Sequence, residues 1–180
     1  MNTSSNTSAA SNSSNYCNLH VTGIGYISRI REVPVKKGTP FMACSIRAMF
    51  GEKGVKDGIQ YTPFDVKAVT PQSAGILRDA MADANTKDKR VMVAFKISDP
   101  EINAFKYTAG EKIGQTGMQM KGRLLLISHV WVKDLTLSDD EQAGNVLVYD
   151  YEAEQRNNAA IAAQADAKAA AEAAKTGTGE

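Results

Sequence analysis

The stretch NLHVTGIGYISRIREV, Asn18 to Val33, decides the fold class together with FMACSIRAMF, Phe41 to Phe50. Both segments are rich in β-branched and aromatic residues, which favour strands, and Gly23 and Gly25 indicate a bend or bulge in the first. Between them, PVKKGTP has the proline and glycine that are typical of a turn. The two segments therefore predict a β-hairpin.

The rest of the chain predicts three more strands and one helix. Residues 61–69, YTPFDVKAV, alternate apolar and polar residues as a strand does, and Thr70 and Pro71 then have the residue types of an N-cap and a first helical position. Apolar residues at a helical period predict about three turns after them. Further strands are expected at Val91 to Ile97 and at Lys121 to Leu137, separated by a polar excursion over residues 98–120 that suits a protruding hairpin or loop.

The resulting order is strand, strand, strand, helix, strand, strand. This is the order of the OB-fold, a mainly β, five-stranded barrel with one helix that commonly binds oligonucleotides. A generic antiparallel sheet with one packed helix has the same order and stays open as an alternative.

Both ends of the chain differ from this predicted domain, which spans residues 16–137. Residues 1–15 are almost entirely Ser, Asn, Thr and Ala and are expected to be disordered, and residues 138–180 form an acidic, Ala-rich segment expected to be a flexible tail. From Tyr16 to Leu137 there are 18 basic against 11 acidic residues, and from Ser138 to Glu180 there are 3 against 9. A basic domain with an acidic tail indicates a polyanionic partner for which the tail can compete, although solubilising charge explains the same counts.

Nothing in the sequence favours catalysis, a cofactor or a metal. His20 and His129 have no metal-ligand spacing or local nucleophile, and the pair Gly23 and Gly25 lacks the rest of a dinucleotide motif. Cys17 and Cys44 are too few for a disulfide framework, and Cys44 is expected to be buried. There is no apolar segment of a signal peptide or membrane span, so we expect a cytoplasmic protein without a membrane partner.

Strand alternation predicts which side chains face outward. In the second strand it places Met42, Cys44, Ile46, Ala48 and Phe50 in the core, and the predicted outer face of the domain is basic and aromatic. Such a face suits single-stranded nucleic acid, because bases stack on aromatic rings and phosphates pair with cations. The candidate stacking residues are Tyr26, Phe41, Tyr61 and Trp131. The candidate phosphate partners are Arg29, Arg31, Arg47, Lys67, Arg123 and Lys133, and Phe105, Lys106 and Tyr107 of the excursion are expected to close over the strand.

The segments HVTGIGYISRIREV, GTPFMACSIRA, YTPFDVKAV, ILRDAM and KRVMVAF resemble bacterial single-stranded DNA-binding proteins over Asn18 to about Lys133. NLHVTGIGYISRIREV followed by KGTPFMACSI is closer still to a poorly characterised family of integrative and conjugative elements, whose members are described as element replication proteins. The resemblance implies an OB-fold, assembly into dimers or tetramers, and cooperative coating of single-stranded DNA. It also implies DNA-facing positions for Arg47, Lys67 and the segment Tyr61 to Phe64.

Two features depart from the housekeeping binders. The chain ends in TGTGE instead of an acidic tip with a terminal Pro-Phe, and it has a single tryptophan. Recruitment of replication or conjugation proteins by such a tip is therefore in doubt. We expect an accessory factor that coats single-stranded DNA during replication or conjugative transfer of a mobile element. The alternatives are an OB-fold protein-interaction adaptor that does not bind nucleic acid, and a binder of duplex DNA or RNA.

Overall fold

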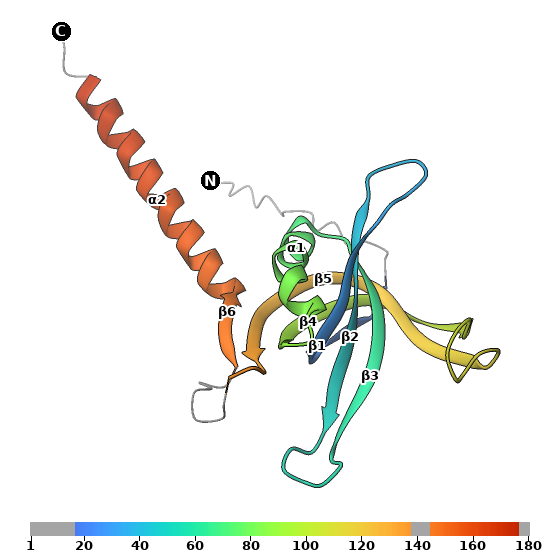
Figure 1. The fold of residues 1–180 in the computed structure, drawn as a ribbon. Coiled ribbons are helices and arrows are strands. Elements are labelled where there is room, and N and C mark those ends of the chain that lie inside the picture. Colours follow the sequence, from blue (N-terminus) through green and yellow to red (C-terminus); the bar gives the residue numbers. More distant parts are fainter. Residues whose placement is uncertain (1–16, 138–144, 177–180) are drawn as a thin grey trace, which may run out of the picture.

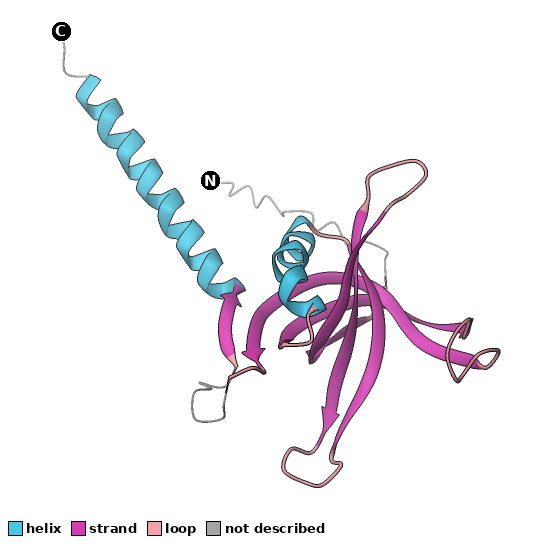
Figure 2. Cartoon of the chain, viewed as in Figure 1, coloured by secondary structure: helices cyan, strands magenta, loops and turns pink. Residues whose placement is uncertain are grey.

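The computed structural model describes residues 17–137 and 145–176, and these form one sheet and two helices (Figure 1). Most of them are in strands (Figure 2), which confirms a mainly β protein. The elements, in chain order, are β1 (His20–Val33), β2 (Phe41–Gly51), β3 (Ile59–Ala68), α1 (Pro71–Asn85), β4 (Lys89–Lys106), β5 (Thr116–Asp134), β6 (Val146–Asp150) and α2 (Tyr151–Thr176). The N-terminal segment predicted to be disordered, residues 1–15, lies outside the described residues.

The strands close into a ring. Their order in the sheet is β3-β2-β1-β4-β5-β6, with antiparallel neighbours, and β3 also pairs with β5 in parallel from Phe64↔Met120 to Ala68↔Leu124. That extra pairing joins the two ends of a five-stranded sheet. The other end of β5, His129 to Val132, is left for β6 to cover.

The core fills the inside of this ring; β4 alternates as predicted, whereas β2 is buried without a break from Met42 to Ile46, including Ser45, which was expected to face outward. Val91, Val93, Phe95 and Ile97 of β4 are all buried, and Met42, Cys44 and Ile46 of β2 face them from across the ring. Burial raises the pKa of the Cys44 thiol to about 12, with a smaller contribution from Asp65. The predicted burial of Phe50 is wrong, since its side chain is 53% exposed. Near Phe50, β2 and β3 extend beyond the ring as a protruding hairpin (Figure 1). Neither face of this hairpin packs against the core.

Helix α1 is tied to the ring at both ends by amide side chains. Thr70 caps it and Pro71 occupies its first turn, as predicted. At its end, Asn85 accepts from Ile30 N (2.9 Å) and donates to Ile30 O (2.8 Å), where a bulge in β1 takes Ile30 out of the ladder. At its start, Gln72 makes the equivalent pair with Ile127 O (2.6 Å) and N (3.4 Å), beside a bulge in β5. The amide side chains of the helix therefore hydrogen-bond backbone groups beside both bulges.

The predicted excursion over residues 98–120 is mostly strand. β4 and β5 continue as a paired hairpin to Lys106↔Thr116, and residues 107–115 connect them at its tip (Figure 1). The hairpin projects from the ring, as predicted.

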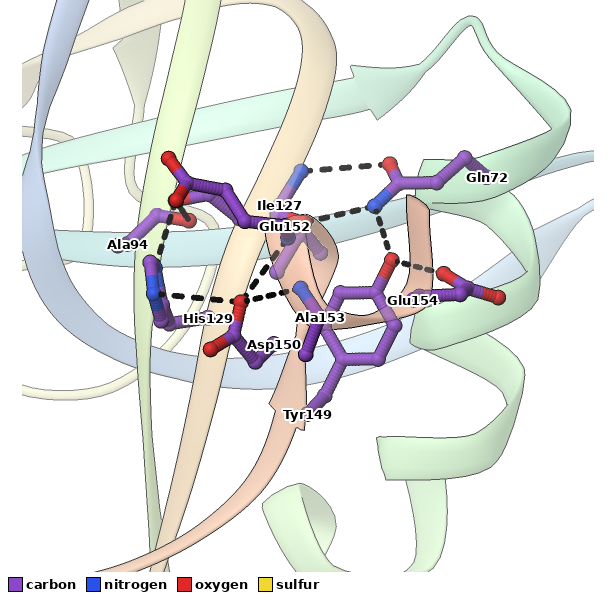
Figure 3. Close-up of polar contacts among 10 residues, drawn as sticks. Gln72, Ala94, Ile127, His129, Tyr149, Asp150, Glu152, Ala153 and Glu154 are labelled. Carbon is purple, nitrogen blue, oxygen red and sulfur yellow. Dashed lines mark hydrogen bonds and ion pairs between the residues drawn. The ribbon is translucent and has the colours of Figure 1, made fainter. Parts of the chain in front are cut away.

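The chain continues beyond the predicted five strands and one helix. β6 pairs with β5, and α2 extends away from the ring (Figure 2). Tyr149 and Asp150 anchor this junction (Figure 3): the Tyr149 hydroxyl accepts from Gln72 (3.1 Å) and donates to Glu154 (2.7 Å), and the Asp150 carboxylate caps α2. The amide N–H of Ala153 is the main reason that the pKa of Asp150 is lowered. The segment after residue 137, which was predicted to be a flexible tail, therefore contains a strand and a helix, β6 and α2. The pairing of β6 with β5 cannot be deduced from the composition of this segment. Within the described residues, neither helix has the length and hydrophobicity needed to cross a bilayer.

Candidate nucleic-acid interface

The outer face of the ring contains a groove of about 480 Å³ lined by aromatic and basic side chains. We call it the basic groove and define it by Tyr26, Arg47, Tyr61, Lys87, Lys89 and Arg90. No carboxylate is among the residues that line it. It lies where β1, β2, β3 and the start of β4 meet the end of α1.

Strand register brings the three predicted residues of the groove together. Tyr26 of β1 pairs with Arg47 of β2, and Tyr61 lies one step further along the same outer face on β3. The two tyrosine rings are 6.3 Å apart between centroids and tilted by 37°, and the Arg47 guanidinium lies 5.7 Å from the centre of the Tyr61 ring. Tyr61 remains 45% exposed. An exposed ring beside a cation gives a base and its phosphate adjacent partners.

Three cations of the groove were missed by the sequence reasoning. Lys87, Lys89 and Arg90 follow α1 in the run KDKR, which has neither helical nor strand periodicity, and the concentration of basic residues was the only signal available. Lys89 donates to Asp83 at 2.7 Å, and this hydrogen bond is the main reason that its pKa is raised. The ion pairs found within residues 17–137 and 145–176 do not include Lys87, Arg90 or Arg47.

The row of side chains that contains Arg47 and Tyr26 extends across the outer face toward β6. Met92 of β4 pairs with Tyr26 on one side and with Trp131 of β5 on the other, so that the predicted Trp131 continues the row of Tyr26 and Arg47. Trp131 is partly buried and stacks on His129, with centroids 5.4 Å apart and planes 8° from parallel. The His129 ring lies 3.8 Å from the Asp150 carboxylate (Figure 3). One neighbouring pair, Arg90↔Lys133, places like charges opposite each other, which is unfavourable unless an anion joins them.

Four other predicted residues gather in a different hollow, of about 440 Å³, which we call the paired cleft. It contains Arg31, Phe41, Lys67 and Arg123, together with three acidic residues. Arg31 pairs with Asp65 at 3.0 Å, Arg123 pairs with Asp99 at 3.1 Å, and the Lys67 ammonium lies 4.4 Å from the centre of the Phe41 ring. These cations therefore already have partners within the protein.

The remaining predicted residues lie apart from both hollows. Arg29 sits in the β1 bulge with a positive φ of 51° and an exposed side chain. In the β4–β5 hairpin, the rings of Phe105 and Tyr107 pack edge to face at 5.0 Å, and the Phe105 ring lies against Gly117, where a Cβ atom would come within 2.6 Å of it. Lys106 is exposed beside them. The structure does not bring this hairpin over the basic groove.

The potential metal-ligating side chains do not cluster in the part of the chain that is described. No group of three or more potential metal ligands occurs there. The Cys44 thiol is buried, as expected, and its raised pKa keeps it protonated.

The family described as "Protein of unknown function (DUF3577)" matches residues 10–146. No curated protein matches the chain in sequence. Among solved structures, the chain is similar to a small single-stranded DNA-binding protein from Streptomyces coelicolor, with 13% identity and a TM-score of 0.39. That match covers 62% of this chain and 94% of the other.

Proposed function

We propose that this chain, which belongs to the family described as "Protein of unknown function (DUF3577)", binds single-stranded DNA along the basic groove. The observation that carries the proposal is the meeting of Tyr26, Tyr61 and four cations in a groove that no carboxylate lines. Each nucleotide of a single strand offers a base to stack and a phosphate to pair, and the groove has both kinds of partner.

The distribution of positive charge in the groove favours a polyanion over a small anion as the ligand. Arg47, Lys87 and Arg90 come from different elements, and the row continues to Lys133 on β5. Each phosphate contact with a single strand contributes about 0.7 to the slope of log affinity against log salt concentration, so that a row of cations produces steep salt dependence. The exposed Tyr61 ring favours an unpaired strand, because the bases of a duplex stack on each other and present only their edges.

We propose further that the chain is an OB-fold protein and that it binds single-stranded DNA without strong sequence preference. The closed ring with α1 between β3 and β4 is consistent with an OB-fold, and contacts through ring faces and phosphates favour binding without strong sequence preference. We infer a non-catalytic accessory role in replication or conjugative transfer of a mobile element, with self-association into dimers or tetramers. This role rests on the resemblance of NLHVTGIGYISRIREV, followed by KGTPFMACSI, to a family of element replication proteins.

Fluorescence anisotropy of a labelled oligo-dT across a salt series tests the proposal directly. We expect binding that weakens steeply with salt and that unlabelled duplex of equal length displaces poorly. Trp131 lies two strands from Tyr26 in the same row, so its emission should change on titration with unlabelled oligo-dT. Absence of binding at low salt would contradict the proposal, and equal competition by duplex would replace it with a general DNA binder.

The alternative is a protein-interaction adaptor, which the β4–β5 hairpin favours. Ile102 and Met118 are each 73% exposed on this projecting arm, and an exposed apolar surface of this kind can bind another protein. The two functions differ in their response to salt and to oligonucleotide. An adaptor would bind its protein partner with little salt dependence, and oligo-dT would not displace that partner.

A further inference from the structure

A third hollow, of about 430 Å³, adjoins the basic groove, and most of its lining side chains are apolar, although Lys53 also lines it. Its walls include Ile24 of β1, Met49 and Phe50 of β2, Ile59 of β3 and Met92 of β4. Phe50 is 53% exposed, and Ile24 and Ile59 are 44% and 38% exposed. Large apolar side chains on a protein surface, gathered around a concave site, indicate a binding surface.

Tyr26 forms a wall of both hollows. In the strand register it has Arg47, a groove cation, on one side and Met92, an apolar wall, on the other. Met49 lies two residues from Arg47 on the same face of β2, a step of roughly 7 Å. An extended molecule with charged and apolar parts a few ångströms apart could therefore occupy the two hollows together.

We propose that this apolar hollow receives the bases of a single strand whose phosphates lie in the basic groove. The inference rests on the proposed function and specifies where the bases go. We infer that bases occupy the hollow for two reasons. The hollow continues the basic groove through a shared tyrosine, Tyr26, and nucleotides combine an anionic backbone with flat apolar faces. The exposed Phe50 ring supplies a further stacking surface.

The test compares two labelled oligonucleotides with the same number of phosphates, oligo-dT and an oligomer of abasic sites. The wild-type protein should bind oligo-dT more tightly, and the ratio of the two dissociation constants measures the contribution of the bases. Phe50→Ala should weaken oligo-dT binding about fivefold or more, the lower end of what stacking on an aromatic ring contributes, and leave abasic binding unchanged. Because Phe50 is exposed, little folding stability should be lost.

Two control variants make the result specific. Lys87→Ala should weaken binding of both oligomers by the same factor, so that the ratio of their dissociation constants stays the same. Ile102→Ala removes an even more exposed apolar side chain from the β4–β5 hairpin and should change neither dissociation constant.

Each other outcome has a distinct meaning. If both oligomers bind with strong salt dependence but Phe50→Ala leaves their ratio unchanged, the base-binding hollow is wrong and the proposed function stands. If neither oligomer binds at low salt, the proposed function itself fails. If Phe50→Ala changes the sedimentation coefficient of the free protein and not the ratio, the hollow is a contact between two copies of the chain and the inference is overturned.

Discussion

The basic groove and the paired cleft are hollows of similar size on one ring, and both contain aromatic and basic side chains, yet their electrostatics differ. In the cleft, Asp65 and Asp99 pair with both arginines, whereas among the described cations of the groove Lys89 alone pairs with a carboxylate, that of Asp83. A cation that already has a carboxylate partner must exchange that partner for a phosphate, and the net gain is small. The number of basic residues is therefore a poor guide to a phosphate site unless their counter-ions are known.

The largest expected effect contrasts two triple variants that remove the same charge. Arg47→Ala/Lys87→Ala/Arg90→Ala should weaken oligo-dT binding on the order of 100-fold at low salt and lower the salt slope by about 2, since three phosphate contacts are lost. Arg31→Ala/Lys67→Ala/Arg123→Ala should weaken it by only about threefold, through net charge alone. Anisotropy across a salt series measures both, with circular dichroism to check folding. Equal losses in the two variants would end the distinction between groove and cleft.

A smaller effect is expected from one ring of the groove. Tyr61→Ala should weaken oligo-dT binding about tenfold at constant salt slope, because stacking contributes roughly 1–3 kcal/mol per base and does not involve counterions. Tyr61→Phe should retain the affinity, since it keeps the ring. Phe41→Ala is the matched change in the cleft and should have little effect. A drop in salt slope for Tyr61→Ala would indicate that the ring acts by holding Arg47, 5.7 Å away.

The two ends of α1 allow a third comparison. Asn85→Ala and Gln72→Ala each leave backbone groups at a bulge without a partner, which should cost about 1–3 kcal/mol of unfolding free energy in urea titrations. Only Asn85 precedes the loop that supplies Lys87 to the groove. We therefore expect Asn85→Ala alone to weaken DNA binding, by a fewfold. Loss of affinity in both variants would point to a general loosening of the ring.

The smallest expected effect is a gain. Asp65→Asn/Asp99→Asn removes the carboxylate partners of the cleft arginines and should tighten oligo-dT binding about threefold at low salt, as expected from surface ion pairs worth below about 1 kcal/mol. This increase in affinity should disappear at high salt. Unchanged affinity would show that strands do not reach the cleft even when its cations are released.

Local sequence patterns predicted much of the fold but only part of the site. Alternation along β2 and β4 correctly identified the buried Ile46 and Val93, and it placed Tyr26, Arg47 and Tyr61 on one outer face. These positions follow from the two-residue period of a strand, which persists wherever one face meets the core. Phe50 fails the same rule, because its strand has already left the ring.

The rest depends on contacts between distant segments. The partner of Arg31 is Asp65, 34 positions away, and the pairing requires the β1 bulge and the β2–β3 register together. Lys87 and Arg90 belong to the groove only because α1 ends there. β6 could not be foreseen from a short apolar segment, since its stability comes from the exposed edge of β5.

The pairing of β6 with β5 also has a practical consequence for anyone shortening the chain. A protein ending at Leu137, the predicted domain limit, would leave the backbone of His129 to Val132 as an open strand edge that other molecules can join. Such a version should aggregate, whereas one that ends after Asp150 keeps the edge covered and removes the whole of the projecting helix α2. The shorter protein would thus give a misleading impression of self-association, so oligomeric state is best measured on a form that retains β6.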